Sequence, residues 1–417
     1  MSELFSNASF LERLLSAFSA LWSFWTVWLP LVLGTVFYET WMKYVHTKFI
    51  AEKETVLLEI RIPRDITKSP VAMEIFLNSL YQSSSGNFIS VFLKGSVRPW
   101  FSLEIVSLGG NVKFFIWCQK SSKNSIEAQL YSQYPNIEIY EAEDYSLPVV
   151  YDQEAIGLNG AQLTLTKPDP YPIKTYVDYG LDRDPKEEFK IDPITPLIEF
   201  LGSLKPQEQG WVQILVQAHK TEKALEGRIF KKKEDWKKAA KDEIKKIVKD
   251  SIFAGGKDKD GNEIKTDYGR ISSAEKDTIL AIERSISKNA FDTMIRLIYV
   301  APKDVFNSGG LGGIIGSLGS FNSLTLNGFK KGWGPTYDYA WQDFGKKKEH
   351  INKRKLLEAY KKRSFFNIPY KNFHGKPFVL TTEELATIFH FPGEVSKTPT
   401  FERILSKKSE APANLPI

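Results

Sequence analysis

The 417-residue sequence has very little cysteine, and Cys118 in the apolar run "KFFIWCQ" is the only one. A single cysteine cannot form an internal disulfide, so we expect the folded part of the chain to lie in a reducing compartment. A catalytic thiol would need a histidine partner, and the sequence indicates none for Cys118. The favoured interpretation is therefore a small, buried side chain.

Motifs for catalysis, cofactors and metals are also missing. The five histidines stand at no metal-ligand spacing, and the sequence has no G-x-S-x-G nucleophile motif. The glycine-rich run "SGGLGGIIGSLGS" lacks the Lys-Ser or Lys-Thr of a phosphate loop, and Ile315 occupies the third glycine position of a dinucleotide motif. Close packing of a helix explains this run better. The sequence predicts a protein that is not an enzyme and uses no cofactor or metal.

The composition is that of a globular protein. Apolar residues make up 42% of the chain and charged residues 25%, and the length favours two or three domains. The net charge of +6 suits a protein that works near an anionic surface. It does not distinguish phospholipid from nucleic acid.

A long uncharged run lies near the N-terminus, from Leu14 to Tyr38. A spanning helix needs about 20 apolar residues. A cleaved signal peptide and a buried soluble helix are alternatives, but the run exceeds a signal-peptide core and bulky residues follow it. We predict a transmembrane helix over residues 14–41, with indoles at the headgroup boundary and a proline kink. Its anchor residues are Trp22, Trp25, Trp28, Pro30 and Trp41.

The charges that flank this run predict its orientation. Arg13 lies upstream, whereas Lys43, Lys48 and Lys53 lie downstream. The flank with more cations stays in the cytoplasm. We therefore expect residues 1–13 outside, the bulk of the chain inside, and a location in the cell inner membrane or cytoplasmic membrane.

Residues 54–150 alternate strand and helix signals in the order βαββαβ. "TVLLEIRIP", "WFSLEIVS", "NVKFFIWCQ" and "NIEIYEAED" read as strands, and Gly109-Gly110 predicts a tight hairpin. Ser69 and Pro70 predict a helix start, and "KNSIEAQLYSQYP" predicts a second helix. This is the order of a ferredoxin-like domain.

Residues 160–335 repeat the order less clearly. "PIKTYVDYGL", "GWVQILVQAHK", "FDTMIRLIYVAP" and "LTLNGFK" read as strands, and "DPITPLIEFLGSLK" and the glycine-rich run read as helices. An insertion over residues 221–290 contains two amphipathic helices that we expect to form a hairpin. The fold class predicted is α+β: one N-terminal transmembrane helix followed by tandem ferredoxin-like domains, the second with a long helical-hairpin insertion.

A basic helical segment follows over residues 336–377. Its centre, "KKKEHINKRKLLEAYKKR", has nine cations against Glu349 and Glu358. A solvated helix face and a patch that contacts phosphates of lipid or DNA are both consistent with this run. The candidate phosphate or lipid contacts are Lys346, Lys347, Lys348, Lys353, Arg354 and Lys355.

Several segments together resemble a known family. "SPVAMEIFLNSLYQ", the stretch "WFSLEIVSLGGNVKFFIWCQ" with its continuation to "EAEDY", and "LTTEELATIFHFPG" with the following tail are similar to the amino-terminal part of membrane-anchored, HerA/TraG-like type IV secretion and conjugative-transfer ATPases of bacteria. In that family the last segment leads into a RecA-like motor. No phosphate loop occurs here, so ATP hydrolysis is carried over to no residue of this chain.

The resemblance implies a motor on a separate chain. Residues 378–417 would then be a docking helix and tail for a P-loop ATPase, with the apolar contacts Leu385, Ile388, Phe389 and Phe391. The first functional hypothesis is a membrane-anchored, non-catalytic assembly component of a secretion-like or DNA-translocation machine. The second is a membrane scaffold that forms a homo-oligomeric ring or cage without a motor. Direct nucleic-acid binding is a third.

Overall fold

The computed structural model describes residues 22–63, 68–182, 191–220, 236–253, 271–337 and 339–393. Contacts divide the chain into two compact units. The smaller unit contains helix α2 (Trp25–Ala51) and the segment Gly86–Val97 with helix α4 (Phe88–Phe92). The larger unit contains every strand of the described chain.

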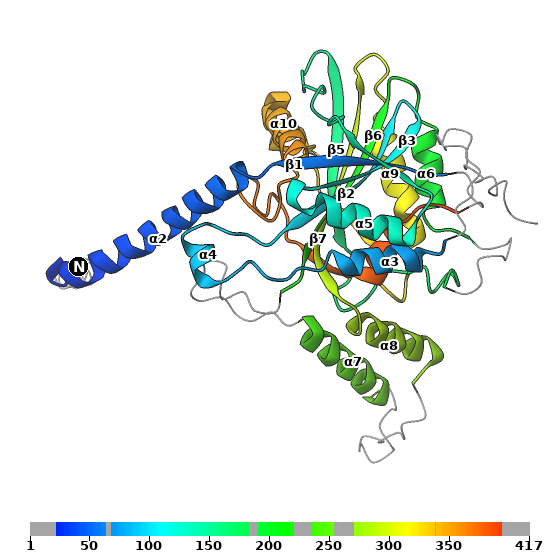
Figure 1. Cartoon of the computed structure of the whole chain (residues 1–417), viewed down its shortest axis with the longest axis horizontal. Helices are drawn as coiled ribbons and strands as arrows, with labels where there is room; N and C mark the ends of the chain where they lie inside the picture. Colours follow the sequence, from blue (N-terminus) through cyan, green and yellow to red (C-terminus); the bar gives the residue numbers. More distant parts are fainter. Residues whose placement is uncertain are drawn as a thin grey trace, which may run out of the picture. The chain divides into compact units, whose positions relative to one another are not determined.

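The larger unit is a mixed α+β structure built on one antiparallel sheet (Figure 1). The sheet has nine strands in the order β4-β1-β3-β2-β6-β7-β5-β8, and β9 pairs with β7. The strands are β1 (Thr55–Arg61), β2 (Trp100–Leu108), β3 (Asn111–Gln119), β4 (Glu138–Ala142), β5 (Ile156–Leu165), β6 (Gln209–Ala218), β7 (Ala290–Pro302), β8 (Phe329–Trp333) and β9 (Phe378–Thr381). The predicted halves therefore share one continuous sheet, joined where β2 pairs with β6.

Local sequence signals explain the first strands and helices. The Ser69 side chain accepts a hydrogen bond from Val71 N, and Pro70 begins helix α3 (Pro70–Ser79), as predicted. Gly109 and Gly110 both have positive φ in the β2–β3 turn, which also confirms the prediction. Helix α5 (Lys123–Gln133) follows as expected.

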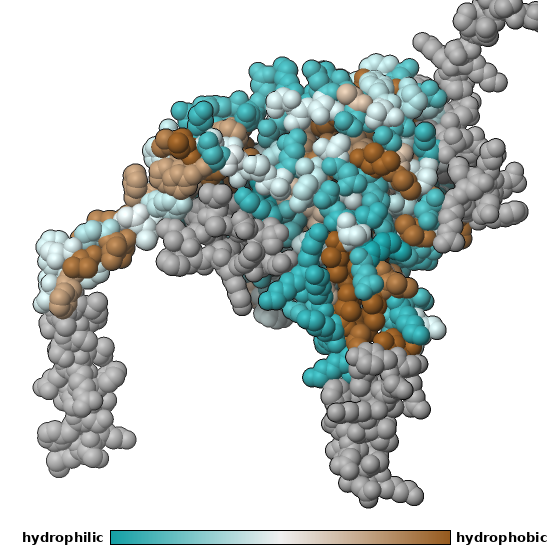
Figure 2. Space-filling view, turned by 60° about the horizontal axis from the view of Figure 1, so that its bottom comes forward, coloured by the Kyte–Doolittle hydropathy of each residue, from teal (hydrophilic) through white to brown (hydrophobic). Residues whose placement is uncertain are grey.

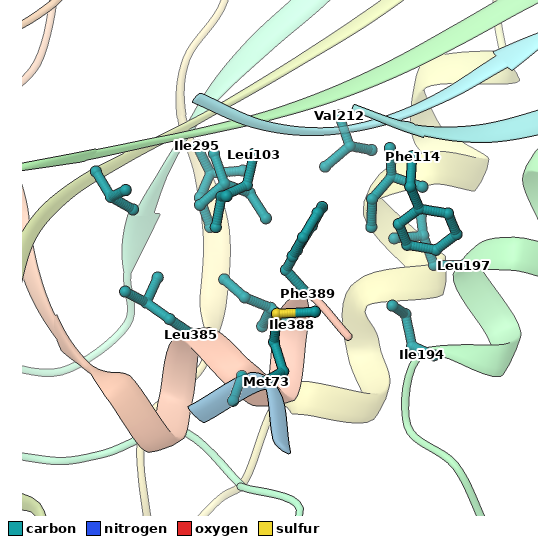
Figure 3. Close-up of a cluster of buried hydrophobic side chains, with 14 of the residues drawn as sticks. Met73, Leu103, Phe114, Ile194, Leu197, Val212, Ile295, Leu385, Ile388 and Phe389 are labelled. Carbon is teal, nitrogen blue, oxygen red and sulfur yellow. The ribbon is translucent and has the colours of Figure 1, made fainter. Parts of the chain in front are cut away.

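One face of the sheet forms the main hydrophobic core. Helices α3, α5, α6 (Thr195–Gly202), α9 (Gly310–Ser317) and α11 (Thr382–Ile388) contribute buried side chains to the same cluster as alternate residues of the strands. Figure 3 shows part of this cluster, in which Leu385, Ile388 and Phe389 lie among side chains of the sheet and of α3. A sheet covered by helices on one face is a common α+β arrangement.

The glycine-rich run forms helix α9, as its small residues predict. A Cβ atom at Gly310 would stand 2.5 Å from the Tyr299 ring, and one at Gly313 would stand 2.1 Å from the Phe200 ring. Such distances are too short for any side chain. The glycines therefore allow α9 to lie against β7 and α6.

The opposite face of the sheet is crossed by helix α10 (Lys347–Lys361) and the loop after it. A Cβ atom at Gly160 of β5 would be 2.6 Å from the Leu356 side chain of α10. Trp100 Nε1 of β2 donates a 3.0 Å hydrogen bond to the Arg363 carbonyl. The segment thus contacts strands on both sides of the β2–β6 junction.

The second half of the sheet departs from prediction at its first strand. Residues 172–181, predicted as a strand, form turns, because the Asp178 carboxylate accepts a hydrogen bond from Thr175 N and closes the chain on itself. The first strand of this half is instead β5, and the short last strand, β8, begins at Phe329 rather than at Leu324. The prediction of a strand over 172–181 was wrong.

The insertion between β6 and β7 contains two helices, as predicted. They are α7 (Trp236–Phe253) and α8 (Ser273–Ile286), which pack on each other. Ser272 and Glu275 form a capping box at the start of α8. Trp236 packs with Ala290 of β7 and Val379 of β9, and this contact holds the first turn of α7 against the sheet.

Candidate functional site

Helix α2 has the most unusual surface of the smaller unit. Its apolar side chains from Trp25 to Phe37 include seven that are between 48% and 67% exposed, and Figure 2 shows this apolar colour along the helix. The seven are Trp25, Val27, Leu31, Val32, Leu33, Val36 and Phe37. Consecutive helix positions differ by about 100° around the axis, so Leu31, Val32 and Leu33 point in three directions. The exposed apolar surface therefore surrounds the helix rather than forming one stripe.

The C-terminal half of α2 is held by its own unit. Met42 and Val45 are buried against Val91 of α4, and Trp41 Nε1 donates a 2.9 Å hydrogen bond to the Phe92 carbonyl. Gly95 has a φ of +69°, and a Cβ atom there would be 2.2 Å from the Val45 carbonyl oxygen. This packing fixes the base of α2 and leaves its N-terminal half exposed.

The prediction of a single-pass transmembrane helix over residues 14–41 was wrong. No helix in the described part of the chain is both long enough and apolar enough to cross a membrane. Residues 1–21 lie outside the described residues.

The predicted anchor residues therefore have other surroundings. Trp22 and Trp25 are exposed, Trp28 is half-buried, and Pro30 lies inside α2. Trp41, predicted at a headgroup boundary, is bonded to Phe92 within the protein. The membrane assignment has no support in the described structure.

The predicted docking residues lie in the hydrophobic core. Leu385, Ile388, Phe389 and Phe391 are all 2% exposed or less. Phe389 and Phe391 each make an edge contact with the Phe114 ring of β3, at 5.7 and 5.6 Å. These side chains are not available to a partner, so the docking role predicted for them must be corrected. Residues 394–417 of the predicted tail lie outside the described residues.

The six predicted phosphate contacts lie on or just before α10. Lys346, Lys347, Lys348, Arg354 and Lys355 are exposed. Lys353 is half-buried and forms a 2.6 Å ion pair with Glu349. The helix and the residue before it therefore offer five exposed cations, and contact with phosphate stays a prediction.

Beneath α10 lies a network of buried charges that sequence reasoning missed. Arg363 donates to both oxygens of Glu104, at 3.0 and 3.1 Å, and also pairs with Asp144. Burial works against the ionised guanidinium, but the charge of Glu104 keeps the pKa of Arg363 well above its ordinary value. Burial would raise the pKa of Asp144, yet the hydrogen bond and charge of Arg363 hold it below its usual value.

The network continues across the sheet as a row of polar residues. Glu104 of β2 stands opposite Gln213 of β6, which stands opposite Arg296 of β7, and Arg296 stands opposite Gln162 of β5. Gln213 Nε2 donates to Glu104 at 3.0 Å and to the Tyr360 carbonyl at 3.1 Å. Burial lowers the pKa of Arg296 to about 9. No periodicity marks these residues in the sequence, because pairing partners come from distant strands.

A second group of buried carboxylates joins α8 to the core. Glu74 of α3 accepts hydrogen bonds from Lys288 at 2.7 Å and from Tyr176 at 2.5 Å. Glu383 of α11 pairs with Arg284 of α8 at 3.0 Å. These contacts attach the helical hairpin to α3 and α11. Each buried carboxylate is thus paired with a cation of the hairpin segment. This structural role accounts for the burial of both carboxylates.

Neighbouring Glu384 caps helix α11. Its carboxylate accepts hydrogen bonds from Thr381 N at 2.8 Å and from Ile173 N at 3.0 Å. Burial nevertheless raises the pKa of Glu384 to about 7. The sequence signal for this role, Thr381 three residues before Glu384, is a capping box that the prediction of an N-capped helix already used.

Two histidines form buried pairs with aspartates. His219 Nδ1 lies 2.6 Å from Asp292, and His390 Nε2 lies 2.9 Å from Asp192. His390 Nδ1 also lies 2.9 Å from the Ala386 carbonyl oxygen. Both ring nitrogens of His390 therefore have partners within the protein, and these contacts hold the end of α11 in place. The described residues contain no group of three or more metal-ligating side chains.

A comparison with protein families gives one match for most of the chain. The model of a domain of unknown function, DUF8128, matches residues 43–403. That range includes the base of α2, the whole sheet and α11. No curated protein matches the chain.

Proposed function

Because the chain belongs to the family described as a domain of unknown function (DUF8128), a description that assigns no activity, we propose from its own surfaces that it is a non-catalytic assembly component. In this proposal, copies of the chain associate through the exposed N-terminal half of α2. The observation that carries the proposal is the apolar surface around all sides of that helix.

The hydrophobic effect favours covering this surface. Burying a half-exposed apolar side chain contributes about 1 kcal/mol, so the seven exposed side chains of α2 would contribute roughly 7 kcal/mol per helix. Association of chains costs several kcal/mol in lost freedom. A gain of this size in each of several helices is enough to offset that cost.

A second copy is the partner that fits best. A helix that is apolar on all sides needs neighbours on all sides. A bundle of identical helices related by rotational symmetry covers the faces that point towards the axis and towards adjacent copies, because every copy brings the same surface. The anchored base of α2, with Trp41 bonded to Phe92, would connect such a bundle rigidly to the rest of the smaller unit.

The resemblance to secretion and conjugation proteins suggests where such an assembly works. We propose a secretion-like or DNA-translocation machine in which a P-loop ATPase on a separate chain supplies the energy. Since the side chains first expected to recruit that ATPase are buried, recruitment would use an exposed element. The α7–α8 hairpin, whose Leu280 is 61% exposed, is the candidate. Without an ATPase the same assembly would be a homo-oligomeric scaffold.

The strand order supports a tandem origin of the sheet. In the first half the order β4-β1-β3-β2 is the 4-1-3-2 order of a ferredoxin-like domain, and in the second half β6-β7-β5-β8 is the same order reversed. The central antiparallel pair Glu104↔Gln213 would lie on a local two-fold axis. We infer two ferredoxin-like halves joined edge to edge through β2 and β6, with α7 and α8 inserted in the second.

The self-association of α2 can be tested by measuring mass. The purified full-length chain should give the mass of an oligomer by light scattering after size exclusion, without detergent. Leu31→Glu should shift the mass towards the monomer, because a bundle would bury the new charge without a partner.

Leu324→Glu is the matched control, since Leu324 is 99% exposed on the larger unit and its replacement should leave the oligomer intact. A wild-type chain that is monomeric without lipid, or that is recovered only as a monomer in phospholipid vesicles, would contradict the proposal.

A further inference from the structure

Exposed aromatic side chains gather just before α10. Tyr337, Tyr339, Trp341 and Phe344 are between 40% and 80% exposed, although aromatic rings are normally buried. The Tyr339 and Trp341 rings stack with their centroids 6.1 Å apart and their planes 20° apart. One short segment therefore exposes four aromatic side chains to solvent.

Contacts hold this segment against α10. Asn352 Nδ2 of α10 donates a 3.2 Å hydrogen bond to the Tyr337 hydroxyl. Asp343 accepts hydrogen bonds from the first N–H groups of α10, including Glu349 N at 2.7 Å. Lys348 Nζ donates to the Gln342 carbonyl at 3.0 Å. The aromatic rings are thus fixed beside the lysines of the helix.

A second aromatic pair joins β8 to the loop that follows α10. The rings of Trp333 and His374 stack face to face, 4.2 Å apart with only 6° between their planes. Burial and the charge of nearby Lys355 lower the pKa of His374, which places this ring close to a cation of α10. Lys330 and Lys331 of β8 are also exposed.

The charge of this strip is positive. Among residues 330–355 that the structure describes, Glu349 is paired with Lys353, and Asp343 is bonded to backbone N–H groups. No carboxylate of the described chain forms an ion pair with Lys346, Lys347, Arg354 or Lys355. These cations are free to contact phosphate.

We propose that this strip, residues 330–337 and 339–355 with His374, binds single-stranded nucleic acid. Unpaired bases stack on exposed aromatic rings while cations contact the phosphates, and both groups are exposed within this strip. A duplex hides its base faces and could use only the cations. An interfacial amphipathic helix would add exposed aliphatic side chains such as leucine to its aromatic rings, yet Ile351 is the only exposed large aliphatic residue in the described part of the strip. This inference is independent of self-association through α2.

Binding can be measured with the full-length chain and a labelled oligo(dT) probe of about 20 nucleotides, by fluorescence anisotropy at about 50 mM salt. Trp341→Ala should weaken binding about tenfold through the loss of one stacked base. The double variant Lys346→Glu with Lys347→Glu should also reduce the salt dependence, with a slope smaller by about 0.7 for each phosphate that the variant no longer neutralises.

Matched controls lie elsewhere on the larger unit. Lys237→Glu with Lys241→Glu makes the same charge change at exposed positions of α7, and Tyr131→Ala removes a ring that is 41% exposed on α5. Both should bind oligo(dT) like the wild type. Circular dichroism of each variant verifies that it is folded.

Comparison of probes decides the class of ligand. Tighter binding of oligo(dT) or oligo(U) than of a duplex of equal length supports the proposal, and the tighter of the two identifies DNA or RNA. Equal binding of duplex with no effect of Trp341→Ala would overturn it. Binding to phosphatidylglycerol vesicles without binding to either oligonucleotide would also overturn it.

Discussion

Replacement of Arg363 by Met tests the network that joins α10 to the sheet. Arg363 and Glu104 are 1% and 0% exposed, and their hydrogen bonds at 3.0 and 3.1 Å satisfy both groups. Removal of one member of a buried ion pair leaves an uncompensated charge and costs about 3–5 kcal/mol. We expect Arg363→Met to lower the free energy of unfolding by this amount at neutral pH.

Urea unfolding followed by tryptophan fluorescence measures the loss. Trp100 is a suitable reporter, because its indole N–H bonds to the Arg363 carbonyl. The double variant Glu104→Gln with Arg363→Met should lose less than Arg363→Met alone, since it leaves no unpaired charge at position 104. A cost below about 1 kcal/mol for Arg363→Met, or additive costs in the double variant, would refute this account of the network.

The cost should also depend on pH. Arg363 holds the pKa of Asp144 below its usual value, so this aspartate stabilises the fold above its unfolded pKa of about 3.9. The stabilisation is lost as pH falls through the lower, folded pKa. The difference between wild type and Arg363→Met should therefore be largest above about pH 4 and should shrink in stronger acid.

Two further predictions concern the core. Burial raises the pKa of Glu384 to about 7 from 4.5, so the folded state keeps a proton that the unfolded state releases, and the free energy of unfolding should fall by about 3 kcal/mol as pH rises across this window. Glu384→Gln should flatten that pH dependence in urea titrations, and an unchanged profile would show that another group titrates. Gly313→Ala should cost about 1–3 kcal/mol by thermal or urea unfolding because its methyl group meets the Phe200 ring, whereas Gly312→Ala, with nothing within 4 Å, should be neutral or stabilising. Equal effects of the two substitutions would contradict the packing described for α9.

Local signals made much of the first half of the sheet predictable. The Ser69-Pro70 start of α3 and the Gly109-Gly110 turn act within a few residues, and each has one dominant physical reading. The pairing of β2 with β6 joins residues about a hundred positions apart, and no local pattern specifies it. The single continuous sheet therefore could not be predicted from local sequence patterns.

Strand β5 was missed because its sequence has a weak strand signal. Gly157 and Gly160 lower its β propensity, but both are needed where Phe306 and Leu356 approach the backbone. Residues 172–181 have the apolar alternation of a strand and instead turn around Asp178. Tertiary contacts override propensity at both places.

The candidate sites show a similar limit. The apolar spacing of Leu385, Ile388 and Phe389 predicts a helix with one apolar face, and it does not tell whether that face meets a partner or the protein's own core. The structure answers that question, since all three are buried. The cations of α10 were found from composition alone, whereas the neighbouring rings of Tyr339 and Trp341 needed the structure to show that they are exposed.

Cross-linking within α2 tests the central claim most directly. Leu33→Cys places a thiol on the exposed part of the helix. Native Cys118 should not react with the cross-linker, because it is buried and burial raises its pKa to about 12. We predict that a short thiol cross-linker joins Leu33→Cys chains into covalent multimers and leaves Leu324→Cys chains monomeric. Monomers alone from Leu33→Cys, at a concentration where the wild type is an oligomer, would contradict assembly through α2.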